Sequence, residues 1–271
     1  MNLVLAHGVF GFRRLLGIEN FNRLAADLEA AFAAWPIRIL VPEVPPIGRI
    51  AARGEQLARA IAAALGDGTL DPARPVHIVA HSMGGLDARY CIAAGCEPQL
   101  AGKIASLTTL GTPHRGSPVA DLLTAQGQFD PVAWVNRLVP GPLREALDNL
   151  DLLAGGILEL TSIATDQFNR RYPDAPGVAY FSYAARGRGA LSVTAAPLLP
   201  LYYFIRQKTG HDNDGLVTIE SAKWGTFLDI WPGDHADMLN HDLNQGPLAE
   251  STALNVREKY REIVTRLAAL A

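Results

Sequence analysis

The first 110 residues alternate short apolar runs with amphipathic stretches, and this alternation restricts the fold more than any other feature of the sequence. Four apolar runs have the length of buried strands: residues 3–6, 37–41, 76–80 and 104–110. The stretches between them space their apolar side chains as helices do: residues 21–35, 50–66 and 86–94. Strands that alternate with helices predict an α/β fold, in which a parallel sheet carries helices on both faces.

The second half of the chain departs from this rhythm. Residues 117–170 show helical and loop patterns, and residues 186–208 combine a cluster of apolar side chains with four basic ones. Strand patterns return at residues 178–184 and 226–231, and residues 253–270 predict a closing amphipathic helix. We therefore expect a single domain over all 271 residues, in which the two irregular segments are helical cap insertions beside the functional site.

Composition excludes several classes of protein. The chain is 49% hydrophobic, which is ample for a large core, and its net charge of −3 gives no attraction to nucleic acid. Its two cysteines, Cys91 and Cys96, lie five residues apart on one predicted helix, so we expect free thiols. The sequence contains no apolar run of membrane-spanning length, and no leader precedes the first strand, which predicts a cytoplasmic protein.

The segment from Ala80 to Gly84 reads Ala-His-Ser-Met-Gly and lies between a predicted strand and a predicted helix. In that context a Gly-x-Ser-x-Gly pattern indicates a nucleophile elbow, a tight turn that exposes the hydroxyl of its central serine, here Ser82. Ala80 stands where the first glycine is usual, and we expect the turn to accept one methyl group. The alternative is a serine that only caps the following helix.

A nucleophilic serine needs a base, and a third group must orient that base. Among seven histidines we predict His235, because it follows the last strand and the turn at Pro232. His241 is the rival, although its surroundings predict a helix. We expect His81, which precedes Ser82, to point away from the site.

The acid should lie on the loop before the last strand. Asp212 and Asp214 both occupy that loop, and we choose Asp214 because the apolar pair Leu216 and Val217 follows it and fixes its position. Asp87, one turn into the helix after the serine, is expected to be a surface or helix-start charge.

Acyl transfer also needs two donors for the oxyanion. The backbone N–H of Met83, directly after the serine, supplies one. The loop after the first strand contains Gly8 and Gly11, which let the backbone approach closely, and we expect the N–H of Val9 to be the second donor.

Six motifs, in this order and spacing, make the chain similar to the bacterial triacylglycerol lipases of the α/β-hydrolase fold, in particular the Proteus and Pseudomonas group. They are residues 6–12 (AHGVFGF), 80–85 (AHSMGG), 110–117 (LGTPHRGS), 167–173 (QFNRRYP), 213–217 (NDGLV) and 234–240 (DHADMLN). The resemblance implies the same roles as the residues do: Ser82 as nucleophile, Asp214 as acid, His235 as base, and Val9 and Met83 as oxyanion donors.

The resemblance also implies a calcium site, at which Asp237 matches one aspartate of the family. The second family aspartate is missing, because no Asp or Glu occurs from Ala175 through His211. We therefore expect no cofactor, and we expect Asp237 instead to cap backbone amides or to pair with an arginine near His235. The paired cysteines of some relatives have no counterpart here.

Together these features predict a serine carboxylic-ester hydrolase, lipase-like, that works through an acyl-Ser82 intermediate. We expect an ester or lipid substrate and transient contact with a lipid interface, and the sequence leaves the oligomeric state open. Three alternatives stay open: an acyltransferase, a polyester depolymerase, and a non-catalytic binding scaffold. The resemblance also leaves open an extracellular location.

Overall fold

The computed structural model describes residues 1–8, 14–15, 18–19, 21, 23–125, 150–188, 194, 198–240 and 255–270. Six parallel strands form its central sheet in the order β4-β1-β5-β6-β7-β8. Their bounds are Asn2–Ala6 (β1), Arg38–Leu40 (β4), Val76–His81 (β5), Ile104–Leu110 (β6), Ala179–Arg186 (β7) and Thr226–Pro232 (β8). The α/β fold predicted from the alternation is confirmed, with strands from both halves of the chain in one sheet.

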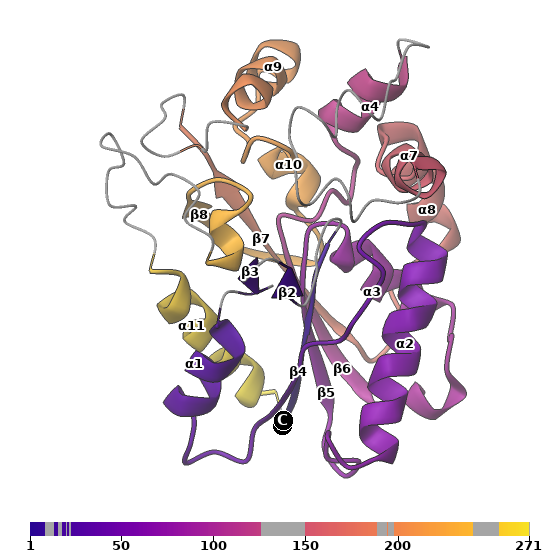
Figure 1. The fold of residues 1–271 in the computed structure, drawn as a ribbon, viewed down its shortest axis with the longest axis vertical. Coiled ribbons are helices and arrows are strands. Elements are labelled where there is room, and N and C mark those ends of the chain that lie inside the picture. Colours follow the sequence, from indigo (N-terminus) through magenta and orange to yellow (C-terminus); the bar gives the residue numbers. More distant parts are fainter. Residues whose placement is uncertain are drawn as a thin grey trace.

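Alternate side chains of the central strands enter two separate cores, as the period of two in a strand requires. From β1, Leu3 and Leu5 pack with α1 (Leu24–Ala31) and α11 (Val256–Ala268), whereas Val4 packs with α2 (Ile50–Gly66). Figure 1 shows α1 and α11 on one side of the sheet and α2 with α3 (Gly84–Ala93) on the other. The sheet is therefore the middle layer of three.

The remaining helices gather at the carboxyl ends of the strands, in the upper part of Figure 1. They are α4 (Pro118–Ala125), α7 (Leu150–Leu158), α8 (Ser162–Arg171) and α9 (Leu199–Thr209), and α4 contacts both α7 and α9. These helices lie in the two segments expected to be cap insertions, although α8 and α9 each end one residue beyond the expected bounds. The short helix α10 (Ile219–Ala222) and the 3₁₀ helices η1 (Pro98–Leu100) and η2 (Asp237–Leu239) complete the elements beside the sheet.

Several boundaries differ from those predicted. The helix expected over residues 21–35 begins only at Leu24, because Phe21 and Arg23 adopt positive φ in a turn that precedes it. A small antiparallel pair, β2 (Arg14–Leu15) and β3 (Ile18–Glu19), was not predicted. Cys91 and Cys96 are free thiols, as expected. No helix in the described part of the chain has the length and apolar character to cross a membrane.

Candidate active site

Ser82 directly follows β5 and has a φ of +55°, which a residue with a side chain rarely adopts. Three hydrogen bonds hold this strained turn. The Ser82 N–H donates to the Leu110 carbonyl at 2.9 Å, and the Ser82 carbonyl accepts from the Gly85 N–H at 3.1 Å and from the Thr112 hydroxyl at 2.7 Å. The surrounding structure therefore fixes the backbone that presents the serine.

Small residues make room for this turn. A Cβ on Gly8 would lie 2.6 Å from the Ser82 Cβ and 3.1 Å from its hydroxyl oxygen, and a Cβ on Gly84 would lie 2.6 Å from the His7 carbonyl oxygen. Ala80, in place of the usual glycine, is fully buried in β5 and pairs with Ala6 of β1. Its methyl group joins the core on the α2 side of the sheet.

Met83 is the N-cap residue of α3. The first N–H groups of a helix have no intrahelical acceptor, and the Met83 N–H has no acceptor among the described residues. It is therefore free to donate to an oxyanion at Ser82, with the positive end of the helix dipole behind it. The other expected donor, Val9, lies outside the described residues, although its neighbour Gly8 packs against Ser82.

Asp214 and His235 form a buried hydrogen-bonded pair. The Nδ1 of His235 lies 2.7 Å from one Asp214 carboxylate oxygen, and the other oxygen accepts from the N–H groups of Leu216 at 2.9 Å and Val217 at 2.7 Å. The backbones of the two residues are also joined, since the His235 N–H donates to the Asp214 carbonyl. Asp212, the rival acid, instead pairs with Arg186 and Arg206 near the surface.

The Asp214 carboxylate determines the state of the imidazole. Burial acts to lower the pKa of His235, but the charge and hydrogen bond of Asp214 outweigh it and raise the pKa above the usual 6.5. Because a carboxylate only accepts, the neutral ring carries its proton on Nδ1. Its Nε2 is then left to accept a proton from a nucleophile.

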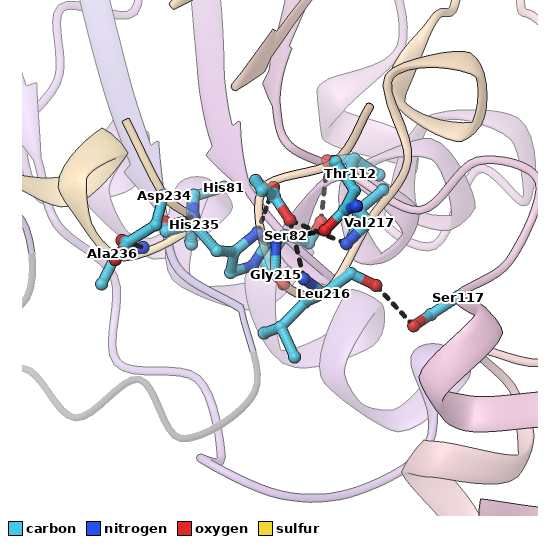
Figure 2. Close-up of polar contacts among 12 residues, drawn as sticks. His81, Ser82, Thr112, Ser117, Gly215, Leu216, Val217, Asp234, His235 and Ala236 are labelled. Carbon is cyan, nitrogen blue, oxygen red and sulfur yellow. Dashed lines mark hydrogen bonds and ion pairs between the residues drawn. The ribbon is translucent and has the colours of Figure 1, made fainter. Parts of the chain in front are cut away.

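Backbone contacts bring this pair to the serine. A Cβ on Gly111, the residue after the Leu110 carbonyl that holds Ser82, would lie 3.2 Å from both Asp214 Oδ2 and His235 Nδ1. In Figure 2 the His235 side chain extends toward Ser82. The structure thus gathers Ser82, Met83, Asp214 and His235 at the carboxyl edge of the sheet.

His81 was expected to point away, and that prediction was wrong. Its ring lies 4.5 Å from the His235 ring, centroid to centroid, and its Nε2 donates to the His235 carbonyl at 2.9 Å. Strand β5 ends with His81, so the end of this strand positions both Ser82 and a side chain that supports His235. Sequence alone does not reveal a contact across 154 residues.

The loop from Gly111 to Ser117 connects the serine to the acid, a role that sequence reasoning did not assign. Figure 2 shows Thr112 at Ser82 and the Ser117 hydroxyl donating to the Leu216 carbonyl, a bond of 2.7 Å. Gly111 adopts positive φ and backs onto the Asp214–His235 pair. The small and hydroxyl residues of this motif were the sequence signal that could have indicated its contacts with the serine and the acid loop.

A second buried ion pair lies beneath the loop that carries Gly8. Arg53 of α2 and Asp87 of α3 are 2.8 Å apart, and Arg53 also donates to the His7 carbonyl at 3.0 Å. Asp87 lies in the first turn of α3, as expected for a helix-start charge, but it is 1% exposed, so the alternative of a surface charge was wrong. The signal for Arg53 was its spacing from Ile50 and Leu57, which places it on the apolar face of α2.

Three other described histidines serve structure. His7, His77 and His114 are buried, and burial lowers the pKa of His7 and His77 to about 4 and that of His114 well below the usual value. His77 bonds the Ser106 hydroxyl, and His114 bonds the Thr109 hydroxyl. His241, the rival base, lies outside the described residues.

Asp237, which the resemblance assigns to calcium, has another task. Its Oδ2 accepts from the Asp234 N–H at 2.7 Å and lies against Gly233, where a Cβ would approach within 2.8 Å. In the described part of the chain no three His, Cys, Asp or Glu side chains form a group that could hold a metal ion. Calcium prefers six to eight oxygen ligands, usually several carboxylates, so the described residues do not fit it.

No protein-family model matches the chain. Its curated relatives include a triacylglycerol lipase of Vibrio cholerae, 28% identical over 98% of this chain and 86% of that protein. Another is a triacylglycerol lipase of Pseudomonas fragi, also 28% identical, over 88% of this chain and 87% of that protein. The crystal structure of Staphylococcus hyicus lipase superposes with a TM-score of 0.72 at 16% identity, covering 99% of this chain and 95% of that one.

The chain is thus similar to bacterial triacylglycerol lipases over nearly its whole length. The expected resemblance to these lipases and the α/β-hydrolase fold are therefore confirmed, and with them the class of enzyme, a lipase-like carboxylic-ester hydrolase. In such an enzyme, a partly exposed serine on a strained turn beside a carboxylate-held imidazole has the arrangement that nucleophilic ester cleavage needs.

Proposed function

We propose that this lipase-like enzyme hydrolyses the ester bonds of acylglycerols, triacylglycerols among them, through an acyl-Ser82 intermediate. The observation that carries the proposal is the buried Asp214–His235 hydrogen bond of 2.7 Å beside the strained Ser82 turn. The curated relatives called triacylglycerol lipases support the substrate class.

The first half of the reaction transfers the acyl group to the enzyme. His235 Nε2 takes the Ser82 proton while the Ser82 oxygen attacks the ester carbonyl carbon, which gives a tetrahedral oxyanion. The Met83 N–H donates to that oxyanion. As the intermediate collapses, the bond from the carbonyl carbon to the alcohol oxygen breaks, and the His235 imidazolium returns its proton to the departing alcohol.

The second half repeats these steps with water. His235 Nε2 takes a proton from a water molecule, whose oxygen attacks the acyl carbon. Collapse breaks the acyl bond to Ser82, and the imidazolium protonates the serine oxygen, which releases a free carboxylic acid. Throughout, Asp214 keeps the proton of Nδ1 in place and stabilises the cation that forms twice in each cycle.

The substrate class can be tested with purified chain and triacylglycerols of short, medium and long acyl chains, the short ones both below and above their solubility limit and the longer ones as emulsions. We expect release of free fatty acid from at least one triacylglycerol, and we expect Ser82→Ala to lower that rate by roughly 10⁴- to 10⁶-fold while the fold is retained. Transfer of the acyl group to an added alcohol in preference to water would identify an acyltransferase. Cleavage of polyesters alone would identify a depolymerase.

A further inference from the structure

The carboxyl end of β7 and the last turn of α9 carry a cationic face, which we define as Arg186, Arg188, Arg206 and Lys208. All four side chains belong to exposed residues. They are the basic residues of a segment without any Asp or Glu from Ala175 through His211, in a chain whose net charge is −3. Positive charge is therefore concentrated on this face, although the chain as a whole is negatively charged.

The four residues form one surface because their elements are adjacent. Asp212 pairs with Arg186 at 3.1 Å and also with Arg206, so a single carboxylate joins the end of β7 to α9. A Cβ on Gly187 would lie 3.4 Å from the Tyr202 ring, which places the backbone of Arg188 beside the same helix.

This face keeps its positive charge. Asp212 is one carboxylate shared by two guanidinium groups, whose side chains are 51% and 49% exposed. The side chains of Arg188 and Lys208 make no ion pair with a described residue. Helix-dipole stabilisation accounts for basic residues in the last turn of α9, but it does not account for Arg186 at the end of β7 or for Arg188 just beyond it.

The cationic face adjoins the candidate active site, and an exposed aromatic side chain lies on the same helix as two of its residues. Tyr203 on α9 is 53% exposed. The start of α9 packs against the acid loop: a Cβ on Gly215 would lie 2.9 Å from the Leu198 side chain. Gly215 directly follows Asp214, so α9 lies next to the candidate active site. Tyrosine prefers the boundary between water and lipid, where basic side chains can reach anionic headgroups.

We propose that the cationic face and Tyr203 bind an anionic lipid surface and hold the Ser82 edge of the sheet toward it. The inference rests on the proposed function only in that the lipid surface would deliver the ester. Each Lys or Arg near an anionic membrane surface adds to binding, and the effect weakens as salt screens the charges.

Binding can be measured without any reaction by sedimentation of the full chain with vesicles of dialkyl ether phosphatidylcholine, with or without dialkyl ether phosphatidylglycerol. These lipids have no carboxylic ester bond to hydrolyse, so a failure of the proposed hydrolysis would not affect the result. The test variant is Arg188→Gln/Lys208→Gln. The matched control is Arg59→Gln/Lys103→Gln, which removes the same two charge types from α2 and from the turn residue that precedes β6.

We expect the anionic vesicles to bind more chain than the neutral ones and to release it as salt rises. The affinity of the test variant for the anionic vesicles should fall by roughly tenfold or more, and the affinity of the control should match that of the wild type. Equal binding to both vesicle types, or equal losses in both variants, would overturn the proposal. Retention on heparin without binding to anionic vesicles would also overturn it and would indicate a soluble polyanion as the partner.

Discussion

Two buried carboxylates lie near the serine, and they differ in what they hold. Asp214 and Asp87 are each 1% exposed and each contacts one nitrogenous side chain, His235 in one case and Arg53 in the other. The imidazole of His235 can lose and regain a proton near neutral pH, whereas the guanidinium of Arg53 keeps its charge. One pair is suited to move a proton and the other to hold a loop in place.

The two carboxylates also differ in how completely their oxygens are hydrogen-bonded. Both oxygens of Asp214 have partners, two N–H groups on one and His235 on the other. Asp87 Oδ1 has no hydrogen-bond partner among the described residues, and burial raises the pKa of Asp87 to about 6 despite the opposing charge of Arg53. The group proposed to act in the reaction is thus the more fully bonded one.

The largest difference should appear when each acid of the Asp214 loop is made neutral. Asp214→Asn removes the acceptor that keeps the Nδ1 proton in place, so we expect kcat to fall by about 10⁴-fold. Asp212→Asn breaks only exposed ion pairs, and we expect kcat within about threefold of wild type. Steady-state hydrolysis of a soluble ester measures both, and a larger loss in the Asp212 variant would contradict the assignment.

The Arg53–Asp87 pair should affect stability more than chemistry. Arg53→Met leaves a buried carboxylate without a cation, which costs about 3–5 kcal/mol in the free energy of unfolding. The double variant Arg53→Met/Asp87→Leu should recover much of that loss because no charge is left buried. Denaturant unfolding checks this, and a single variant as stable as wild type would show that the pair does not hold the loop beneath Gly8.

The sequence predicted the parts of the molecule that depend on local patterns. The strand and helix periods gave the sheet and its flanking helices, and the spacing of the motifs selected Ser82, Asp214 and His235. The supports could not be predicted in the same way, because His81 reaches His235 across 154 residues and Thr112 reaches Ser82 through the fold. Asp87 was expected to be a surface or helix-start charge, and the reasoning from the helix start did not consider that Arg53 of another helix packs against it.

The acid limb of the pH profile distinguishes the two carboxylates further. His235 must be neutral to accept a proton, and its pKa is raised above 6.5 by Asp214. The kcat/KM should therefore fall about tenfold per pH unit once the pH drops below a midpoint that lies above 6.5. The Arg53→Met variant should keep that midpoint, whereas a midpoint below 6.5 in the wild type would argue against the Asp214–His235 pair.

The smallest effect is expected from removing divalent cations. Asp237 already accepts a backbone N–H, so exhaustive treatment with EDTA should leave both activity and Tm nearly unchanged. Matched samples with added calcium or magnesium complete the comparison. A large loss that calcium restores and magnesium does not would show that the chain binds calcium through ligands other than those expected.

The most direct test of the account is covalent labelling of the serine. We predict that a fluorophosphonate forms one adduct, mapped to Ser82 by peptide mass spectrometry, and that Asp214→Asn slows its formation far more than Asp212→Asn does. Ser82→Ala should abolish labelling. A labelled residue other than Ser82, or equal labelling rates in the two aspartate variants, would contradict the claim that the Asp214–His235 pair activates this serine.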